Sequence, residues 1–159
     1  MTIRRALPKD LSRINELLHQ VHDVHSAGRP DIFNKGNKKY NDDEILSIIS
    51  DNNTPVFVAV DNLDVVYGYC FCIIEEVENN PSLVDMMSLY IDDLCVDEKC
   101  RGKHVGTLLY DYVIDYATKI GCYHVTLNVW CMNEPAMQFY LKRGLKPLKI
   151  VMEKVLEKD

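Results

Sequence analysis

The sequence predicts an α/β fold in which helices cover both faces of one central, mostly antiparallel sheet. Segments with the 3.6-residue hydrophobic period of a helix alternate along the chain with short segments rich in β-branched and aromatic residues. Three of the strand-like segments follow one another in mid-chain, separated by polar turns, as in an antiparallel meander. The predicted order is strand, helix, helix, three strands, helix, strand, helix and strand, which is typical of a mixed sheet flanked by helices.

The first third of the chain predicts one strand and two helices. Apolar side chains recur on one face of a segment that opens at Pro8 and runs to about Ala27, where Gly and Pro interrupt the pattern. Asn41 and Glu44 have the spacing of a capping box, which predicts the start of a short second helix. The predicted elements are a strand at Thr2–Leu7, a helix over 8–27 and a helix that ends at Ser50.

The middle of the chain predicts three strands. A turn at Asp61–Asp64 separates the first two, and a polar loop near Pro81 separates the second from the third. The predicted strands are Pro55–Val60, Val65–Glu75 and Met87–Val96.

The last third predicts two helices, each followed by a strand. The first helix has the clearest amphipathic pattern in the chain, and Gly121 ends it where a left-handed residue is favoured. Asn133 is a suitable cap for the second helix, with Pro135 in its first turn and Gly144 at its end. The predicted elements are a helix at Thr107–Ile120, a strand at Tyr123–Val129, a helix over 133–144 and a strand at Lys149–Leu156.

Length and composition indicate one globular domain over residues 1–159, since ~150 residues is typical of a domain. Eighteen basic and 24 acidic residues give a net charge of −6, which disfavours nucleic acid as a partner. The charged N-terminus lacks a following apolar segment, and the longest apolar run, Tyr67–Ile74, is far too short to cross a membrane. None of the six Cys form a CxxC pair, so we expect a cytoplasmic protein with reduced thiols and no metal.

A loop rich in glycine and basic residues precedes the clearest helix. Gly102 and Gly106 allow close backbone approach to an anion, and Arg101 and Lys103 add positive charge. The N-terminus of a helix offers unpaired N–H groups and a partial positive charge. The pattern predicts a phosphate-binding loop, with an ordinary solvated connection as the alternative. It matches neither the Walker nor the GxGxxG pattern.

Arg101–Thr107 resembles the Arg/Gln-x-x-Gly-x-Gly/Ala pyrophosphate loop of the GNAT superfamily, the acyl-CoA-dependent N-acyltransferases. Leu94 and Val96 look like the family's strand that pairs with the pantetheine arm. Asn133–Leu145 is similar to its Asn-x-x-Ala-x-x-Phe-Tyr-x-x-x-Gly-Phe helix. His104 departs from the pattern, because it stands where the loop usually has its middle Gly. The motifs follow the family's order and spacing, so the resemblance covers nearly the whole chain and implies a GNAT-like fold.

The resemblance implies transfer of an acetyl group from acetyl-CoA to a primary amine by direct attack in a ternary complex. Tyr140 matches the family's thiol-protonating Tyr, and a phenol of pKa about 10 suits the proton transfer to a departing thiolate. The alternative is that Tyr140 is an ordinary residue of an amphipathic helix. The residues expected to bind coenzyme A are Leu94, Cys95, Val96, Arg101, Gly102, Lys103, His104, Val105, Gly106, Thr107, Asn133 and Tyr140.

Two acidic residues precede this pantetheine strand segment. By strand alternation, Asp92 shares a face with Leu94, and Asp93 points to the opposite face. The resemblance implies that Asp92 acts as base or as anchor for the amine, with Asp93 as the second choice. The alternative is a pair of acids at a strand bulge or edge. Backbone N–H groups of Leu94 and Val96 would polarise the thioester oxygen and hold the pantetheine amide.

The acceptor is expected to be a small-molecule amine or a peptide amine. His22 and His25 are expected to be surface or edge histidines of the first helix. The resemblance offers the alternative that they, with Phe33 and Asp92, border the acceptor pocket. A homodimer would use apolar segments such as Tyr67–Ile74 or Ile150–Leu156. The alternative function is a catalytically silent acyl-CoA sensor or protein-binding module, for which His104 is the sequence hint.

Overall fold

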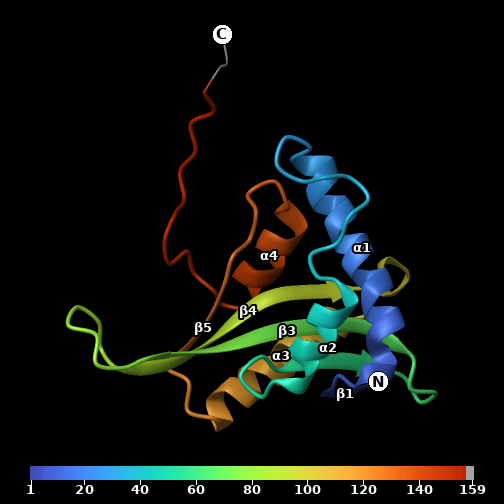
Figure 1. Cartoon of the computed structure of the whole chain (residues 1–159), viewed down its shortest axis with the longest axis horizontal. Coiled ribbons are helices and arrows are strands. Elements are labelled where there is room, and N and C mark those ends of the chain that lie inside the picture. The colour runs from blue at the N-terminus through green and yellow to red at the C-terminus, as the bar shows by residue number, and fades with distance from the viewer. Residues whose placement is uncertain (157–159) are drawn as a thin grey trace. The chain divides into compact units, whose positions relative to one another are not determined.

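The computed structural model describes residues 1–156 and divides into two compact units, Met1–Asn128 and a second that begins at Val129. The first unit is built on a five-stranded sheet in the order β1-β2-β3-β4-β5 (Figure 1). Its strands are β1 (Thr2–Arg5), β2 (Val56–Val60), β3 (Val66–Val77), β4 (Met86–Val96) and β5 (His124–Leu127). Strands β1 to β4 are antiparallel neighbours, and β5 runs parallel to β4. The predicted mixed, mostly antiparallel sheet is therefore confirmed.

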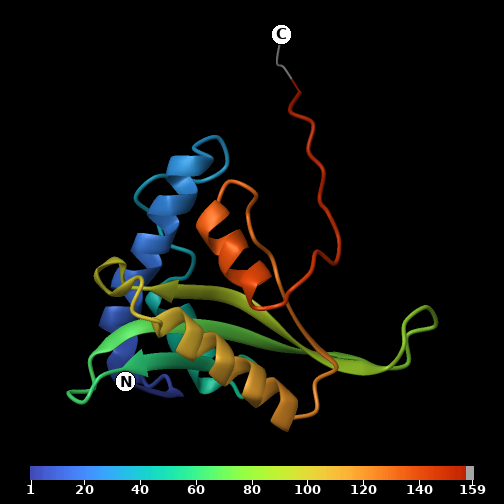
Figure 2. The same ribbon diagram turned by 180° about the vertical axis from the view of Figure 1, so that it is seen from behind.

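Helices cover both faces of this sheet, as the sequence predicts. Figure 1 shows α1 (Leu11–Gly28) and α2 (Asp42–Ser50) on one face, and Figure 2, from behind, shows α3 (Val105–Lys119) on the other. A short 3-10 turn, η1 (Pro8–Asp10), precedes α1, so the α-helix begins three residues later than predicted. Among residues 1–156, no helix is long and apolar enough to cross a bilayer.

Each face of the sheet carries its own apolar core. On the α1–α2 side, buried residues of both helices pack against alternate residues of β2 and β3. The members with no exposed surface include Ile14, Leu17, Leu18, Ile45, Val58 and Tyr69. On the α3 side, the ring of Phe57 lies 5.1 Å from that of Tyr112 and 5.0 Å from that of Tyr116.

The predicted capping box at the start of α2 is confirmed atom by atom. The Glu44 backbone N–H donates to Asn41 Oδ1 at 2.9 Å, and the Asn41 N–H donates to Glu44 Oε2 at 2.7 Å. These two bonds satisfy donors that the first turn of a helix otherwise leaves unpaired. The box therefore explains why the long polar loop after α1 ends at this residue.

The second unit contains α4 (Glu134–Lys142). The side chain of Asn133 accepts a hydrogen bond from the Ala136 N–H at 3.3 Å, and Pro135 lies in the first turn. After the helix ends, Gly144 takes a φ of +86°, a left-handed conformation that glycine adopts without strain. The predicted cap, proline and terminal glycine are all confirmed.

One sequence prediction about an apolar segment is wrong. Lys149–Leu156 forms no strand, because β-propensity yields a strand only where a neighbouring strand supplies ladder hydrogen bonds, and none in the described chain pairs with it. Its apolar side chains are exposed, with 88% of Val151 and 85% of Met152 accessible. Tyr67–Ile74, by contrast, lies in β3, which is hydrogen-bonded to β2 and β4 on its two edges. It therefore has no free strand edge to offer a second copy.

Candidate active site

A β-bulge in β4 decides where the two predicted acidic residues point. Asp93 pairs with Phe71 and Ile91 pairs with Cys72, so Asp92 is an extra residue with no partner in the β3–β4 register. A bulge interrupts the strict alternation of side chains along a strand. Asp92 and Asp93 are consequently both held by tyrosines that pack in the core on the α1–α2 side. The prediction that alternation places them on opposite faces is wrong.

Asp92 is held by two residues of the loop between α1 and α2. Lys39 Nζ donates to Asp92 Oδ1 at 2.7 Å and to its backbone oxygen at 3.2 Å. The hydroxyl of Tyr40 donates to Asp92 Oδ2 at 2.5 Å, and its ring stacks on Phe71 with centroids 5.7 Å apart. Burial, followed by the hydrogen bond to Asp92, raises the pKa of Tyr40, which keeps this hydroxyl a donor. Sequence analysis did not identify Lys39 or Tyr40.

Asp93 occupies a drier environment than its neighbour. The hydroxyl of Tyr69, which has no exposed surface, donates to Asp93 Oδ2 at 2.8 Å. Burial raises the pKa of Asp93 to about 6, although the hydrogen bonds from Tyr69 and from the Leu94 N–H favour the charged form. The bulge thus places one carboxyl in an ion pair and another, with a raised pKa, directly beside it.

The strand beyond the bulge has an open edge. The β4–β5 register ends at Ile91 and Leu127, whereas β4 continues to Val96 along β3. Among the described strands, none pairs with this edge of Asp92–Val96. Leu94, Cys95 and Val96 on this edge are predicted to contact the cofactor. The Sγ of Cys95 points at the Leu17 carbonyl oxygen, 3.4 Å away in the core on the α1 side. Only the backbone of Cys95 is therefore available to a ligand.

The connection from β4 to α3 is anchored to α1. Asp97 is buried, pairs with Arg13, and accepts from the Lys99 N–H at 2.9 Å. The Glu98 N–H donates to the side chain of Gln20 at 3.1 Å. These contacts hold the start of the loop in place. They link segments far apart in the chain, and no local sequence pattern indicated them.

The predicted phosphate loop, Arg101–Thr107, runs into α3, whose first turn includes its last three residues. Arg101, Gly102, Lys103 and His104 are exposed, and the His104 side chain makes no capping hydrogen bond to the helix. Gly102 has a φ of +76°. His104 has a φ of +62°, the left-handed conformation that the family's usual glycine adopts freely. The loop therefore presents basic groups and the start of a helix to solvent.

Val105 differs from the rest of this loop, because its side chain is 2% exposed and belongs to the core. A Cβ built on Gly68 of β3 would lie 3.4 Å from Val105 Cγ1 and 3.1 Å from Leu109 Cδ1. It would also lie only 2.8 Å from the backbone oxygen of Cys95. Gly68 thus allows the first turns of α3 to pack directly on the sheet. Sequence analysis did not identify this glycine.

Three of the four predicted acceptor residues form a cluster at the C-terminal end of α1, and the fourth, Asp92, lies in the bulge of β4. The ring of Phe33 lies 5.9 Å from that of His22 and 5.2 Å from that of His25. His22 Nε2 donates to the backbone oxygen of Asn34 at 2.6 Å, which fastens the following loop to the helix. Burial lowers the pKa of His25, and the nearby His22 and Lys39 lower it further. Across residues 1–156, no three His, Cys, Asp or Glu side chains are grouped to hold a metal ion.

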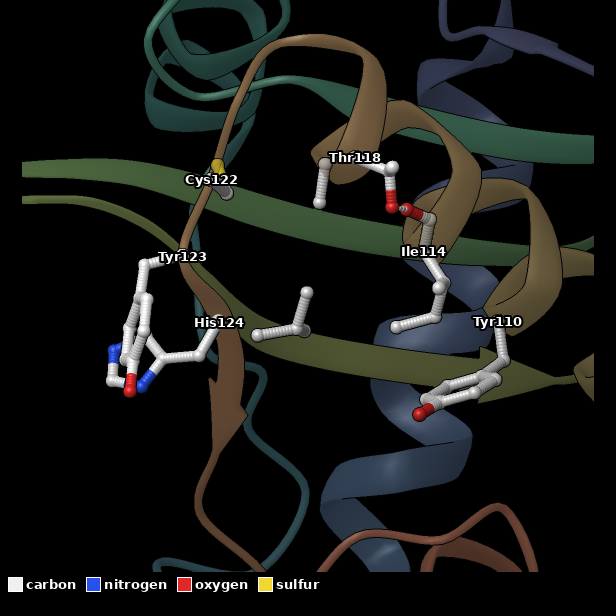
Figure 3. Close-up of a pocket in the computed structure, with 8 residues that line it drawn as sticks. Tyr110, Ile114, Thr118, Cys122, Tyr123 and His124 are labelled. Carbon is white, nitrogen blue, oxygen red and sulfur yellow. Dashed lines mark hydrogen bonds between the residues drawn. The ribbon is translucent and has the colours of Figure 1, made fainter.

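A shallow hollow of about 240 Å³ lies between the second half of α3 and β5 (Figure 3). Aromatic, aliphatic and thiol side chains line it: Tyr110, Ile114, Ala117, Thr118, Cys122, Tyr123, His124 and Val125. The hydroxyl of Thr118 is satisfied within its own helix by the Ile114 backbone oxygen, 2.8 Å away. The residues predicted to bind coenzyme A or the acceptor lie elsewhere, so this hollow is not part of the candidate site.

Asn133 and Tyr140, the remaining predicted site residues, belong to the second unit. The Asn133 side chain caps α4, and Tyr140 lies two residues before the helix end, with its ring 5.2 Å from that of Phe139. Asn133 therefore has the structural role that its position predicts, and the catalytic role of Tyr140 stays a prediction.

Comparison with known proteins identifies the family. Residues 18–145 match the family model described as the acetyltransferase (GNAT) family. The chain belongs to the GNAT family of acetyltransferases. Within this family, a glucosamine 6-phosphate N-acetyltransferase of Arabidopsis thaliana is 32% identical to this GNAT protein over 68 residues. The aligned region spans 43% of this chain and 44% of that relative, which is less than half of either.

Solved structures share the fold of this GNAT protein. A mutant of the BH1408 protein of Bacillus halodurans is 30% identical, covers 98% of this chain with all of its own, and superposes with a TM-score of 0.94. The aminoglycoside N-acetyltransferase AAC(6')-Iy, solved in complex with CoA, is 16% identical, covers 99% of this chain with all of its own, and has a TM-score of 0.69. The GNAT fold that the motifs imply is therefore confirmed.

Proposed function

We propose that this GNAT protein transfers an acetyl group from acetyl-CoA to a primary amine by direct attack in a ternary complex. One observation carries the proposal: β4 leaves its pairing with β5, bulges at Asp92, and runs into a basic loop that ends at the N-terminus of α3. An open strand edge can hold an extended, amide-bearing arm by strand-like hydrogen bonds. A helix N-terminus can hold a pyrophosphate.

The residues of the first unit fit coenzyme A. The backbone of Leu94, Cys95 and Val96 would hold the pantetheine arm. The loop Arg101–Thr107, whose first four residues are exposed, would hold the pyrophosphate. His104 has a φ in the left-handed region, so the loop backbone has the conformation that a glycine at this position would adopt. This supports binding of coenzyme A by the loop despite the histidine. Bound acetyl-CoA supplies a thioester carbonyl that an amine can attack.

The acidic residues of the bulge would position and deprotonate the amine. Asp92 already binds an ammonium group, that of Lys39, at 2.7 Å, so its geometry suits a cationic acceptor. Asp93, with a pKa of about 6, is the second candidate for the base. Tyr140 would give its proton to the departing thiolate. The relatives named for glucosamine 6-phosphate and aminoglycosides support a small amine as acceptor.

The first experiment compares thermal unfolding of the purified protein alone and with acetyl-CoA, CoA, ATP or NADH. A ligand that binds only the native state raises the unfolding midpoint by mass action. We expect acetyl-CoA and CoA to raise the midpoint and ATP and NADH to leave it unchanged. If neither acetyl-CoA nor CoA raises the unfolding midpoint, the proposal is overturned.

The second experiment separates the enzyme from a silent sensor of the same fold. Release of free CoA thiol is followed from acetyl-CoA with a panel of polyamines, aminoglycosides, amino acids and peptides with N-terminal or lysine amines. An enzyme releases thiol with at least one amine, whereas a sensor binds acetyl-CoA and releases none. Binding without release across the panel would favour the sensor.

A further inference from the structure

The ammonium group of Lys39 sits in a cage that would suit any primary amine. It donates to the Asp92 carboxylate at 2.7 Å and to the Asp92 backbone oxygen at 3.2 Å, and it lies 5.3 Å from the centre of the Tyr40 ring. A carboxylate, a carbonyl and an aromatic face are the groups that recognise an alkylammonium ion. A primary amine thus already occupies the bulge of β4.

The two members of this ion pair differ in mobility. The Asp92 side chain is 11% exposed and is also held by Tyr40, whose ring is stacked on Phe71. The Lys39 side chain is 43% exposed, so its flexible stem can leave the cage into solvent. The cage is therefore fixed, while its occupant can be exchanged.

We propose that Lys39 Nζ stands where the acceptor nitrogen reacts, and that Lys39 is itself acetylated when the protein holds acetyl-CoA without an acceptor. The inference rests on the proposed function, because it needs a thioester bound along β4. It adds a modification site and defines the acceptor class as a primary alkylamine that displaces Lys39.

The reaction balances without a further reagent. The Lys39 ammonium loses one proton to Asp92 or water, and its lone pair attacks the thioester carbonyl carbon. The new C–N bond forms as the C–S bond breaks, and the thiolate leaves and is protonated. The products are Nζ-acetyl-lysine and CoA thiol, with one proton released to solvent.

Lys38 provides a matched control on the same loop. Its Nζ donates to Asp42 Oδ1 at 2.7 Å and also contacts the Asn15 side chain, so it is bound to α1 and α2 and not to the bulge. Both lysines are paired with an aspartate, and their chemistry is the same. They differ in position relative to β4 and in exposure, which is 20% for the Lys38 side chain and 43% for the Lys39 side chain. Asp92→Asn, which keeps both exposures, therefore separates the effect of the bulge from that of accessibility.

The test incubates the wild-type chain with acetyl-CoA alone and maps acetylated lysines by peptide mass spectrometry over time. We expect Lys39 to gain an acetyl group at least about tenfold faster than Lys38, because a positioned amine gains from proximity. Asp92→Asn should remove that preference. Equal rates at the two lysines, or the same rates in heat-denatured protein, would overturn the inference.

A complementation experiment tests the acceptor class without self-modification. Lys39→Ala removes the three carbons and the nitrogen that n-propylamine can restore. We expect added n-propylamine to stimulate thiol release by Lys39→Ala at least about tenfold more than by wild type or Lys38→Ala. No stimulation, with other amines still acetylated, would overturn this inference alone. Absence of any acetyl-CoA binding would instead overturn the proposed function, and this inference with it.

Discussion

At the scale of single residues, the bulge of β4 gives two adjacent carboxyls different environments. Asp92 is held by Lys39 Nζ and by the Tyr40 hydroxyl. Asp93 is half-buried beside the fully buried Tyr69, and desolvation raises its pKa to about 6. Neighbouring carboxyls with separated environments can take different roles in proton transfer, one as an anchor and one as a base.

Asp93 makes a testable prediction about stability against pH. Because its pKa in the folded protein lies above the usual 3.8, the folded state binds more protons than the unfolded state between those values. The stabilisation is full below pH 4 and is lost as the pH rises through about 6. At 1.36 kcal/mol per unit the loss amounts to about 3 kcal/mol.

The measurement is the free energy of urea unfolding of wild type and Asp93→Asn from about pH 4 to pH 7. The difference, wild type minus variant, should fall as the pH rises. Asp43→Asn, at an exposed position of α2, is the matched control for the loss of one carboxyl. If the difference in unfolding free energy between wild type and Asp93→Asn does not change with pH, the raised pKa of Asp93 is contradicted.

His104 predicts a stabilising substitution. Its φ of +62° strains a side-chain-bearing residue, and His104→Gly removes that strain. After subtracting the larger entropy of glycine in the unfolded chain, we expect a net gain of about 0.5–1 kcal/mol in unfolding free energy. Lys103→Gly, one residue away and outside the left-handed region, should lose stability instead. Urea unfolding measures both, and a loss in His104→Gly would contradict the loop geometry.

Tyr140→Phe tests the proposed general acid. The variant removes the hydroxyl and keeps the ring on α4. We expect turnover to fall by roughly 100-fold or more while acetyl-CoA still raises the unfolding midpoint, since general acid catalysis is typically of that size. Full activity in the variant would show that another group protonates the thiolate.

At the scale of elements, the position of α3 depends on one residue of β3. Gly68 lets the first turns of the helix pack against the sheet, while Arg13 and Gln20 of α1 hold the loop that leads to it. Packing and loop anchoring therefore act together on the helix N-terminus that the proposed site uses.

Gly68→Ala should disturb that arrangement. Its Cβ would lie 2.8 Å from the Cys95 backbone oxygen, which cannot rotate away as a side chain can. We expect a loss of about 1–3 kcal/mol in unfolding free energy, the usual result of overpacking, together with weaker acetyl-CoA binding. Urea unfolding and isothermal titration check the two effects. An unchanged variant would mean that α3 does not pack as closely as the structure indicates.

At the scale of the whole molecule, the exposed C-terminal segment predicts self-association. Ile150, Val151 and Met152 are between 76% and 88% exposed, and contiguous exposed apolar residues mark interaction surfaces. With β3 enclosed on both edges, this segment is the remaining candidate of the two that the sequence offers for a homodimer.

Light scattering on the purified protein should therefore give twice the 18.3 kDa chain mass. The double variant Ile150→Asp, Met152→Asp should shift the protein toward monomer, because burying a charge in an apolar contact is unfavourable. Lys149→Glu changes a charge in the same segment and serves as the control that should stay dimeric. A monomeric wild type would exclude this role for the segment.

The sequence by itself determined the order of the elements up to α4, the capping box at Asn41 and Glu44, the cap at Asn133 and the glycine-rich loop before α3. These features depend on residues close together in the chain, whose spacing matches a helical period or a cap. The motifs also identified the family through the same local spacings.

Only the tertiary structure decided how the candidate site is assembled. The bulge that turns Asp92 toward Lys39 is a mismatch between two strands, so neither strand reveals it alone. The contact of Arg13 with Asp97 and the close packing at Gly68 join segments distant in sequence. Lys149–Leu156 has the composition of a strand and does not form one, because a strand requires a partner that its own residues cannot supply.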